Sequence, residues 1–171
     1  MGYRWRSVHA TGSSAEATAR SAVAPAGSSR HGFLVLSLLA GPVGGLALYV
    51  GDHLGALALP HARFGWAGLA ISLLLAPMLE ELVFRGGIQD ALDRTPWGRL
   101  CVFGGLSVGN VLTSLLFSAA HLMAAPAWLA GAIFFPSLVL GRLKQLYSSL
   151  VPVVLVHAWF NVCYLTAGAV M

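Results

Sequence analysis

The chain has 171 residues, of which 57% are hydrophobic and only 9% are charged, and its formal net charge is +4. Soluble domains carry about 25% charged residues, and a chain this short has too little interior to hide so much apolar surface from water. The composition therefore excludes an ordinary soluble domain and predicts a polytopic membrane protein. The basic clusters lack interleaved aromatic residues, so nucleic acid is not an expected partner.

The first 32 residues differ in composition from the rest of the chain. They are rich in Ala, Ser and Gly, contain scattered arginines and show no apolar periodicity. This composition predicts a disordered tail over 1–32, followed by a transmembrane domain over 33–171. In a signal peptide only a short charged region precedes the apolar part, and this tail is too long to be such a region. We therefore expect no cleaved signal sequence.

Five apolar segments follow the tail. The first runs over about 33–50, the second starts near Phe64, and the third lies within about 100–125. The fourth, 127–140, is short and contains a proline, and the fifth runs from near Leu150 to the C-terminus. A bilayer-spanning helix needs ~20 apolar residues. The pattern predicts an all-α bundle of about five spanning helices.

Lysines and arginines between these segments predict the orientation. With the N-terminus inside, eight basic residues face the cytoplasm, only Arg63 faces the opposite side, and Arg85 lies within the membrane. The eight are Arg4, Arg6, Arg20, Arg30, Arg94, Arg99, Arg142 and Lys144. This bias predicts a multi-pass protein of the cytoplasmic (inner) membrane with a cytoplasmic N-terminus.

The second segment contains PMLEELVFRGG, residues 77–87, which puts two carboxylates and a guanidinium into the membrane. Such groups cost about 2.5–3.5 kcal/mol each on insertion scales, so they need a partner or a task. Glu81 and Arg85 are four residues apart, and a structural ion pair explains them as well as catalysis does. Glu80 points about 100° away from Glu81, so the same pair cannot easily satisfy it. A lone membrane carboxylate of this kind predicts a general base or a shared proton.

Polar residues also recur at helical spacing in the third segment, where Asn110, Ser114, Phe117 and His121 share a face. A hydrogen-bonded seam between helices would explain this face equally well, because Asn and Ser commonly hydrogen-bond across such seams. This segment alone therefore does not distinguish a structural role from a functional one.

The fifth segment adds His157 and Asn161, which are four residues apart and share one face. Alone, this pair also fits a structural role. Together with Glu80 and His121, however, it supplies a base, two imidazoles and an amide donor from three separate helices. That combination suits the activation of a water molecule and the stabilisation of an oxyanion.

The depth of these residues constrains the helices. Glu80 and His121 can meet only if the second helix continues to about Leu92 and the membrane portion of the third segment starts near Ser107. Each residue then lies ~20 Å from the cytoplasmic boundary, at 1.5 Å per residue. We therefore predict a long second helix and a broken or interfacial stretch near 97–106.

The three motifs together resemble the CPBP family, the CAAX-protease and bacteriocin-processing group of intramembrane endopeptidases. The family pattern is EExxxR, then FxxxH, then HxxxN, each on a different transmembrane helix. This chain reads EELVFR from Glu80, FSAAH from Phe117 and HAWFN from His157. The resemblance covers roughly residues 64–168 and implies a glutamic-type intramembrane endopeptidase.

The resemblance implies roles for four catalytic residues. It makes Glu80 the base that activates the attacking water, with His121 helping to hold that water. His157 and Asn161 would stabilise the oxyanion of the tetrahedral intermediate. An expected substrate is a membrane-anchored protein or peptide, such as one with a C-terminal sorting tail, and the bilayer is the other expected partner.

The resemblance further implies that Glu81 and Arg85 brace the site and that Phe117 packs beside it. We expect no cofactor, because the chain has no HExxH zinc signature, although two His and a carboxylate could still bind zinc. Cys101 and Cys163 are expected to be small hydrophobic residues without a disulfide, since no CxxC or Cys/His metal spacing occurs.

Two other functions remain open at this point. A non-catalytic immunity or scaffold protein of the same fold would keep these motifs for folding alone. A small proton-coupled carrier would use membrane carboxylates and histidines as a relay. The absence of inverted repeats from the sequence counts against the carrier.

Overall fold

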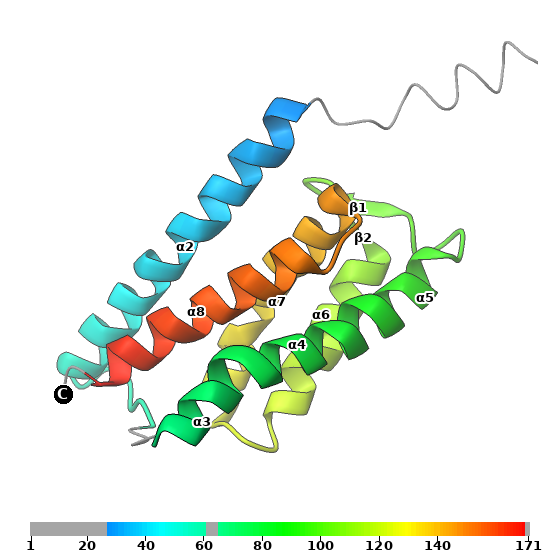
Figure 1. Cartoon of the computed structure of the whole chain (residues 1–171). Helices are drawn as coiled ribbons and strands as arrows, with labels where there is room; N and C mark the ends of the chain where they lie inside the picture. Colours follow the sequence, from blue (N-terminus) through cyan, green and yellow to red (C-terminus); the bar gives the residue numbers. More distant parts are fainter. Residues whose placement is uncertain (1–26, 61–64, 170–171) are drawn as a thin grey trace, which may run out of the picture.

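Apolar helices make up most of the computed structural model, which describes residues 27–60 and 65–169 (Figure 1). Within these ranges, four helices are long and apolar enough to cross a membrane, and residues 108–121 form a shorter apolar helix. The prediction of an all-α transmembrane bundle with about five spanning helices is confirmed. The chain is a multi-pass membrane protein.

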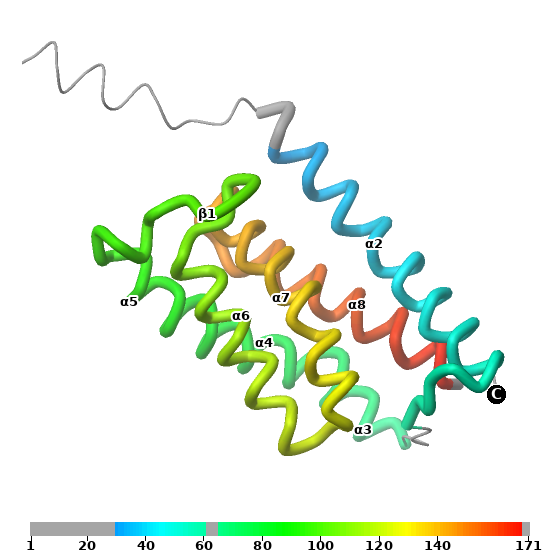
Figure 2. The backbone as a smooth tube through the Cα atoms, turned by 180° about the vertical axis from the view of Figure 1, so that it is seen from behind, coloured from blue at the N-terminus to red at the C-terminus, as the bar shows by residue number. Residues whose placement is uncertain are grey.

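Successive passes run in opposite directions, with α2 beside α8 and α6 beside α7 (Figures 1 and 2). The second pass is one continuous helix built from five parts, two of them π-helical. The elements are α2 (Gly27–His53), α3 (Trp66–Ala70), π-helical η1 (Ile71–Leu75), α4 (Ala76–Glu81), π-helical η2 (Leu82–Gln89), α5 (Asp90–Asp93), β1 (Cys101–Phe103), β2 (Leu106–Ser107), α6 (Val108–His121), α7 (Ala127–Tyr147) and α8 (Val151–Ala169).

The second pass extends over 28 residues, Trp66–Asp93, as the depth argument required. The next pass, α6, begins at Val108, and its N-cap Ser107 accepts a hydrogen bond from the Asn110 backbone N–H at 3.0 Å. Between them the predicted interruption is a turn followed by an antiparallel hairpin of β1 and β2. Its turn contains Gly104 and Gly105 with φ of 56° and 81°, a conformation that side chains other than glycine rarely adopt.

The first pass begins earlier than the apolar pattern indicated. Helix α2 starts at Gly27, so residues 27–32 are helical. The sequence predicts a disordered tail over these residues, and the structure differs from that prediction here. The remainder of the expected tail, 1–26, lies outside the described residues, and so does Arg63. The ends of α5 and α7 and the hairpin of β1 and β2 lie at one end of the bundle (Figure 1). At the end of α7, the Tyr147 hydroxyl donates to the Arg30 carbonyl near the start of α2 at 3.2 Å.

Helix α2 packs closely on α8 because glycines line its contact face. A Cβ at Gly41 would lie 2.9 Å from the indole nitrogen of Trp159, and a Cβ at Gly45 would lie 2.9 Å from the Cys163 carbonyl oxygen. Small residues permit such close approach between membrane helices. Where α2, α7 and α8 meet, buried aliphatic side chains form the hydrophobic core: Leu140, Leu143, Val153 and Val156.

Proline inside α2 creates a second link to α8. Pro42 has no N–H, so it cannot donate to the Leu38 carbonyl four residues earlier. The indole N–H of Trp159 donates to this same carbonyl at 2.8 Å. A backbone group that would otherwise be unpaired in lipid is thereby satisfied by a side chain of a neighbouring helix.

The glycine contact predicts a difference between adjacent positions of α2. Gly45→Ala should destabilise the protein by about 1–3 kcal/mol, because its methyl group would push against the backbone of α8 and that backbone cannot rotate away. Gly44→Ala is the matched control, since a Cβ there meets nothing within 4 Å. Unfolding of both variants by titration with a denaturing detergent measures the difference. Equal stability of the two variants would show that α2 does not pack closely on α8.

Candidate active site

Glu81 is the most enclosed acidic group among the described residues, with no solvent exposure. Its Oε1 accepts a hydrogen bond from Nδ1 of His157 at 2.7 Å. Its Oε2 lies 3.2 Å from Nε of Arg85, one helical turn away, in an ion pair that lacks hydrogen-bond angles. The expected pairing of Glu81 with Arg85 is present, and His157 from α8 joins it.

Arg85 is held from its other side by α7. Its Nη2 donates to the Ser137 carbonyl at 3.0 Å and to the Ser137 hydroxyl at 2.8 Å. Its guanidinium carbon also lies 4.7 Å from the centre of the Phe117 ring, in cation–π geometry. The guanidinium is fully buried, so these contacts from α6 and α7 replace part of its hydration, while Nε and Nη1 have no hydrogen-bond partner.

Glu80 occupies a different environment on the next face of the helix. Its side chain keeps 32% of its exposure, whereas that of Glu81 keeps none. Its Oε2 lies 3.5 Å from Nε2 of His157. The imidazole of His157 therefore stands between two carboxylates, and only the one at Glu80 can be reached from outside the helix bundle.

His157 is fixed in orientation by this arrangement. An N–H on Nδ1 faces the buried Glu81 carboxylate, so the opposite nitrogen, Nε2, faces Glu80. A carboxylate at one ring nitrogen sets the tautomer and aims the other nitrogen. The arrangement can present one imidazole nitrogen to a reacting group beside the Glu80 carboxylate.

Phe117 connects the second histidine to this cluster. Its buried ring lies 4.6 Å from the His121 ring and 5.8 Å from the His157 ring, centre to centre. His121 is partly exposed, and its Nδ1 lies 2.8 Å from the Phe117 carbonyl, which makes Nδ1 the protonated nitrogen and leaves Nε2 free to accept. The structure thus brings His121 to the cluster through Phe117.

Asn161 lies one turn beyond His157, and its described contact is to another helix. Its Nδ2 donates to the Ser72 carbonyl at 2.9 Å. That carbonyl lies in the π-helical segment η1, where Ala76 N–H donates to Ile71 and the next residue, Pro77, has no N–H. Asn161 therefore supplies a donor that the proline removed, and one of its two amide hydrogens is used in this way.

Sequence reasoning did not find two polar residues that support the cluster. Ser137 holds Arg85, and the fully buried Gln89 donates to the Gly141 carbonyl of α7 at 3.1 Å. Gln89 follows Glu81 and Arg85 at the same four-residue spacing, so this pattern could have revealed it. The sequence around Ser137 shows no such spacing of polar residues, and Pro136 is the only notable residue beside it.

A metal site has no obvious ligand set in the part of the chain that the structure describes. Within 27–60 and 65–169, no group of three or more His, Cys, Asp or Glu side chains is arranged to hold a metal ion. Cys101 is exposed and Cys163 is buried, and both are free thiols.

The buried ion pair predicts a large effect on stability. Arg85→Leu should destabilise the protein by about 3–5 kcal/mol, because it leaves the Glu81 charge without its cation. Lys144→Gln is the control: it breaks a partly exposed pair with Asp90, at 2.6 Å, and should cost about 1 kcal/mol or less. Detergent-unfolding midpoints of the two variants check this order. A smaller loss for the Arg85 variant would contradict it.

The link between Asn161 and the proline predicts a coupling. Asn161→Ala should cost about 1–3 kcal/mol, since it leaves the Ser72 carbonyl unpaired in the membrane. Pro77→Ala restores an N–H near that carbonyl, so the same Asn161 change should then cost about 1 kcal/mol less. A double-mutant cycle of unfolding free energies measures this difference, and strict additivity would show that the two residues do not serve the same carbonyl.

Comparison with known proteins places the chain in a family. A family model described as "Type II CAAX prenyl endopeptidase Rce1-like" matches residues 61–163, which is more than half of the chain and includes all three motifs. No curated protein and no solved structure matches. The family is one of CAAX-type intramembrane proteases, which supports peptidase activity, and it agrees with the resemblance seen in the sequence. The chain belongs to the type II CAAX prenyl endopeptidase Rce1-like family.

Proposed function

We propose that this protein is a glutamic-type intramembrane endopeptidase in which Glu80 activates the attacking water. The observation that carries this proposal is the position of His157 between two unequal carboxylates. Glu81, fully buried, orients the imidazole, while Glu80, which is partly exposed, faces its other nitrogen at 3.5 Å. One carboxylate thus has a structural partner, and the other remains available to take a proton.

The charges of the cluster favour a particular resting state. Glu80 and Glu81 contribute two negative charges, and Arg85 contributes one positive charge. The mechanism we propose needs a proton on each ring nitrogen of His157, which would bring the net charge of the cluster to zero inside the membrane. The Nε2–H of His157 would then be a hydrogen-bond donor beside Glu80.

The reaction follows from these positions. Glu80 takes a proton from a water molecule, and the resulting hydroxide attacks the carbonyl carbon of the scissile peptide bond. Nε2–H of His157 donates to the oxyanion, and the second amide hydrogen of Asn161 is our candidate for a further donor. The proton held by Glu80 then passes to the leaving amine as the C–N bond breaks. His121, with Nε2 free to accept, helps to hold the water.

The depth of Glu80 indicates the kind of substrate. It lies 13 residues from Asp93 in a helix of 28 residues, so it is ~20 Å along the helix from that end. A peptide bond cleaved there belongs to a segment that enters the membrane. We infer a membrane-anchored protein or peptide as substrate, with a C-terminal sorting tail as the favoured class.

The test compares cleavage by Glu80→Gln with cleavage by the unaltered protein, after co-expression with candidate membrane-anchored substrates. Loss of the general base should reduce the rate by about 10²–10⁴-fold, read from product termini by mass spectrometry. Asp90→Asn, in the same helix but outside the cluster, is the control and should cleave normally. Insertion of both variants is checked by their recovery from membranes.

Two results would overturn the proposal. Cleavage by Glu80→Gln at the rate of the Asp90→Asn control would remove Glu80 from the reaction. Loss of cleavage with a chelator, restored by added zinc, would replace the metal-free mechanism.

The double variant Pro77→Ala with Asn161→Ala separates the two roles of Asn161. Recovered stability without recovered cleavage supports its role as a hydrogen-bond donor to the oxyanion.

A further inference from the structure

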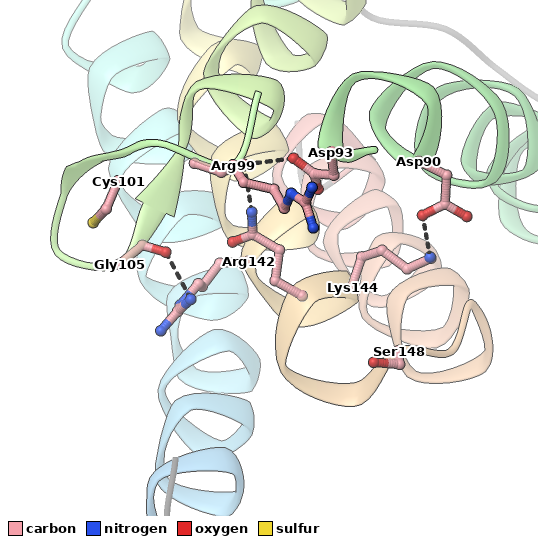
Figure 3. Close-up of a pocket in the computed structure, with 10 residues that line it drawn as sticks. Asp90, Asp93, Arg99, Cys101, Gly105, Arg142, Lys144 and Ser148 are labelled. Carbon is pink, nitrogen blue, oxygen red and sulfur yellow. Dashed lines mark hydrogen bonds and ion pairs between the residues drawn. The ribbon is translucent and has the colours of Figure 1, made fainter. Parts of the chain in front are cut away.

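A cavity of about 770 Å³ has none of the residues of the Glu80 cluster in its lining. Figure 3 shows the residues that line it. It is enclosed by the end of α5, the hairpin of β1 and β2, and the last turns of α7. Most of the residues that line it are of polar or charged types. They include Asp90, Asp93, Arg99, Arg142 and Lys144, together with Gly105 of the hairpin turn.

The two acidic residues of the cavity already have partners. Asp90 accepts from Nζ of Lys144 at 2.6 Å. Asp93 is turned toward the start of α6, where its Oδ1 accepts from the Ser107 hydroxyl at 2.9 Å and lies against Gly109. The positive end of the α6 dipole compensates the charge of Asp93 there. Neither carboxylate is left to neutralise a further cation.

Two arginines in the same cavity lack such a partner. Arg142 donates to the Gly105 carbonyl at 2.6 Å, and Arg99 reaches only the Arg94 carbonyl, at 3.5 Å. Among the described residues, neither guanidinium lies within ion-pair distance of a carboxylate. The cavity therefore has an excess of positive charge with donors free to bind an anion.

The surface beside the cavity is apolar. Leu100, Val102 and Phe103 of the hairpin region are 60%, 59% and 80% exposed, and Trp97 is 47% exposed. Exposed aliphatic and aromatic side chains next to arginines, at the ends of spanning helices, are typical of a segment lying in the interface between lipid headgroups and acyl chains. The cavity thus opens where lipid phosphates are found.

We propose that this cavity binds the phosphate of an anionic phospholipid headgroup, with Arg99 and Arg142 as its ligands. A guanidinium suits phosphate oxygens because its donors form a planar fork. The apolar hairpin favours a lipid over free phosphate, since the acyl chains of a lipid can cover Val102 and Phe103. The bound lipid bridges the hairpin and α7, and so braces the end of the helix that carries Glu80.

The test uses the full chain in nanodiscs of phosphatidylcholine with a minor fraction of phosphatidylglycerol. Native mass spectrometry measures how much phosphatidylglycerol stays bound on release into detergent. Arg99→Gln and Arg142→Gln should each lower this retention by about tenfold or more, the factor expected for loss of a charge-assisted hydrogen bond to the phosphate. Arg142→Lys keeps the charge and should retain most of the lipid.

Arg94→Gln is the matched control, because Arg94 has the same charge and lies at the same end of the bundle but does not line the cavity. It should retain phosphatidylglycerol like the unaltered protein. An equal loss of phosphatidylglycerol from Arg94→Gln would overturn the proposal. It would show that any positive charge at this end of the bundle attracts the anionic lipid. Displacement of the lipid by excess inorganic phosphate would also overturn it, in favour of a free-phosphate site.

Folding and substrate binding are separated by two further measurements. Arg99→Gln breaks only one long contact, so it should keep the helical circular-dichroism spectrum even where Arg142→Gln does not. If both variants keep phosphatidylglycerol but lose cleavage of a membrane-anchored substrate, the cavity binds substrate instead and the lipid proposal is wrong. Loss of lipid with cleavage retained supports the proposal and leaves the catalytic proposal untouched.

Discussion

Neutralisation of the buried Glu81 carboxylate is the constraint on which the arrangement of the other helices depends. A charge without water needs a counter-charge and hydrogen bonds, and here the helix of Glu81 and three other helices supply or support them. Arg85 comes from the same helix, His157 comes from α8, and Ser137 of α7 and Phe117 of α6 hold the arginine. Removing any of these groups leaves a buried charge without one of its partners. The cluster therefore holds the helices in fixed positions relative to one another.

Helix α8 also repairs the backbone of its neighbours. Proline leaves a carbonyl without its usual donor in α2 and again in η1, and in both places a side chain of α8 donates to that carbonyl. Trp159 and Asn161 perform this task from positions two residues apart. Because His157 lies on the same stretch of α8, the contacts that secure the helix also secure the imidazole between the two carboxylates.

Much of this architecture follows from helical periodicity and length. The 100° angle between adjacent residues separates Glu80 from Glu81, and the structure places the two carboxylates in different environments. The need for Glu80 and His121 to share a depth predicted both the long second helix and the interruption near 97–106, which is the hairpin. These features depend on the length of each helix, which follows from the number of residues in the sequence and the fixed rise per residue.

The partners across helices could not be predicted in the same way. Asn161 was expected to face the reacting group, yet its described contact is the Ser72 carbonyl, which is free only because η1 is π-helical just before Pro77. A shift of backbone hydrogen bonding by one residue leaves no mark in hydrophobic periodicity. Ser137 likewise holds Arg85 only because it lies opposite the guanidinium. This role could not be predicted without knowing how α7 packs on the second pass.

The same constraint supports the proposal that only one of the two adjacent glutamates serves as the base. A single buried carboxylate that had to change its charge during each reaction would disturb the packing around it. In the reaction we propose, Glu81 would keep a constant set of partners while the proton moves at Glu80, where the side chain is 32% exposed. His157 contacts both carboxylates, so it can respond to the charge at Glu80 while Glu81 holds its ring in place. The division of labour between the two glutamates is thus a consequence of burial, and it requires them to be adjacent.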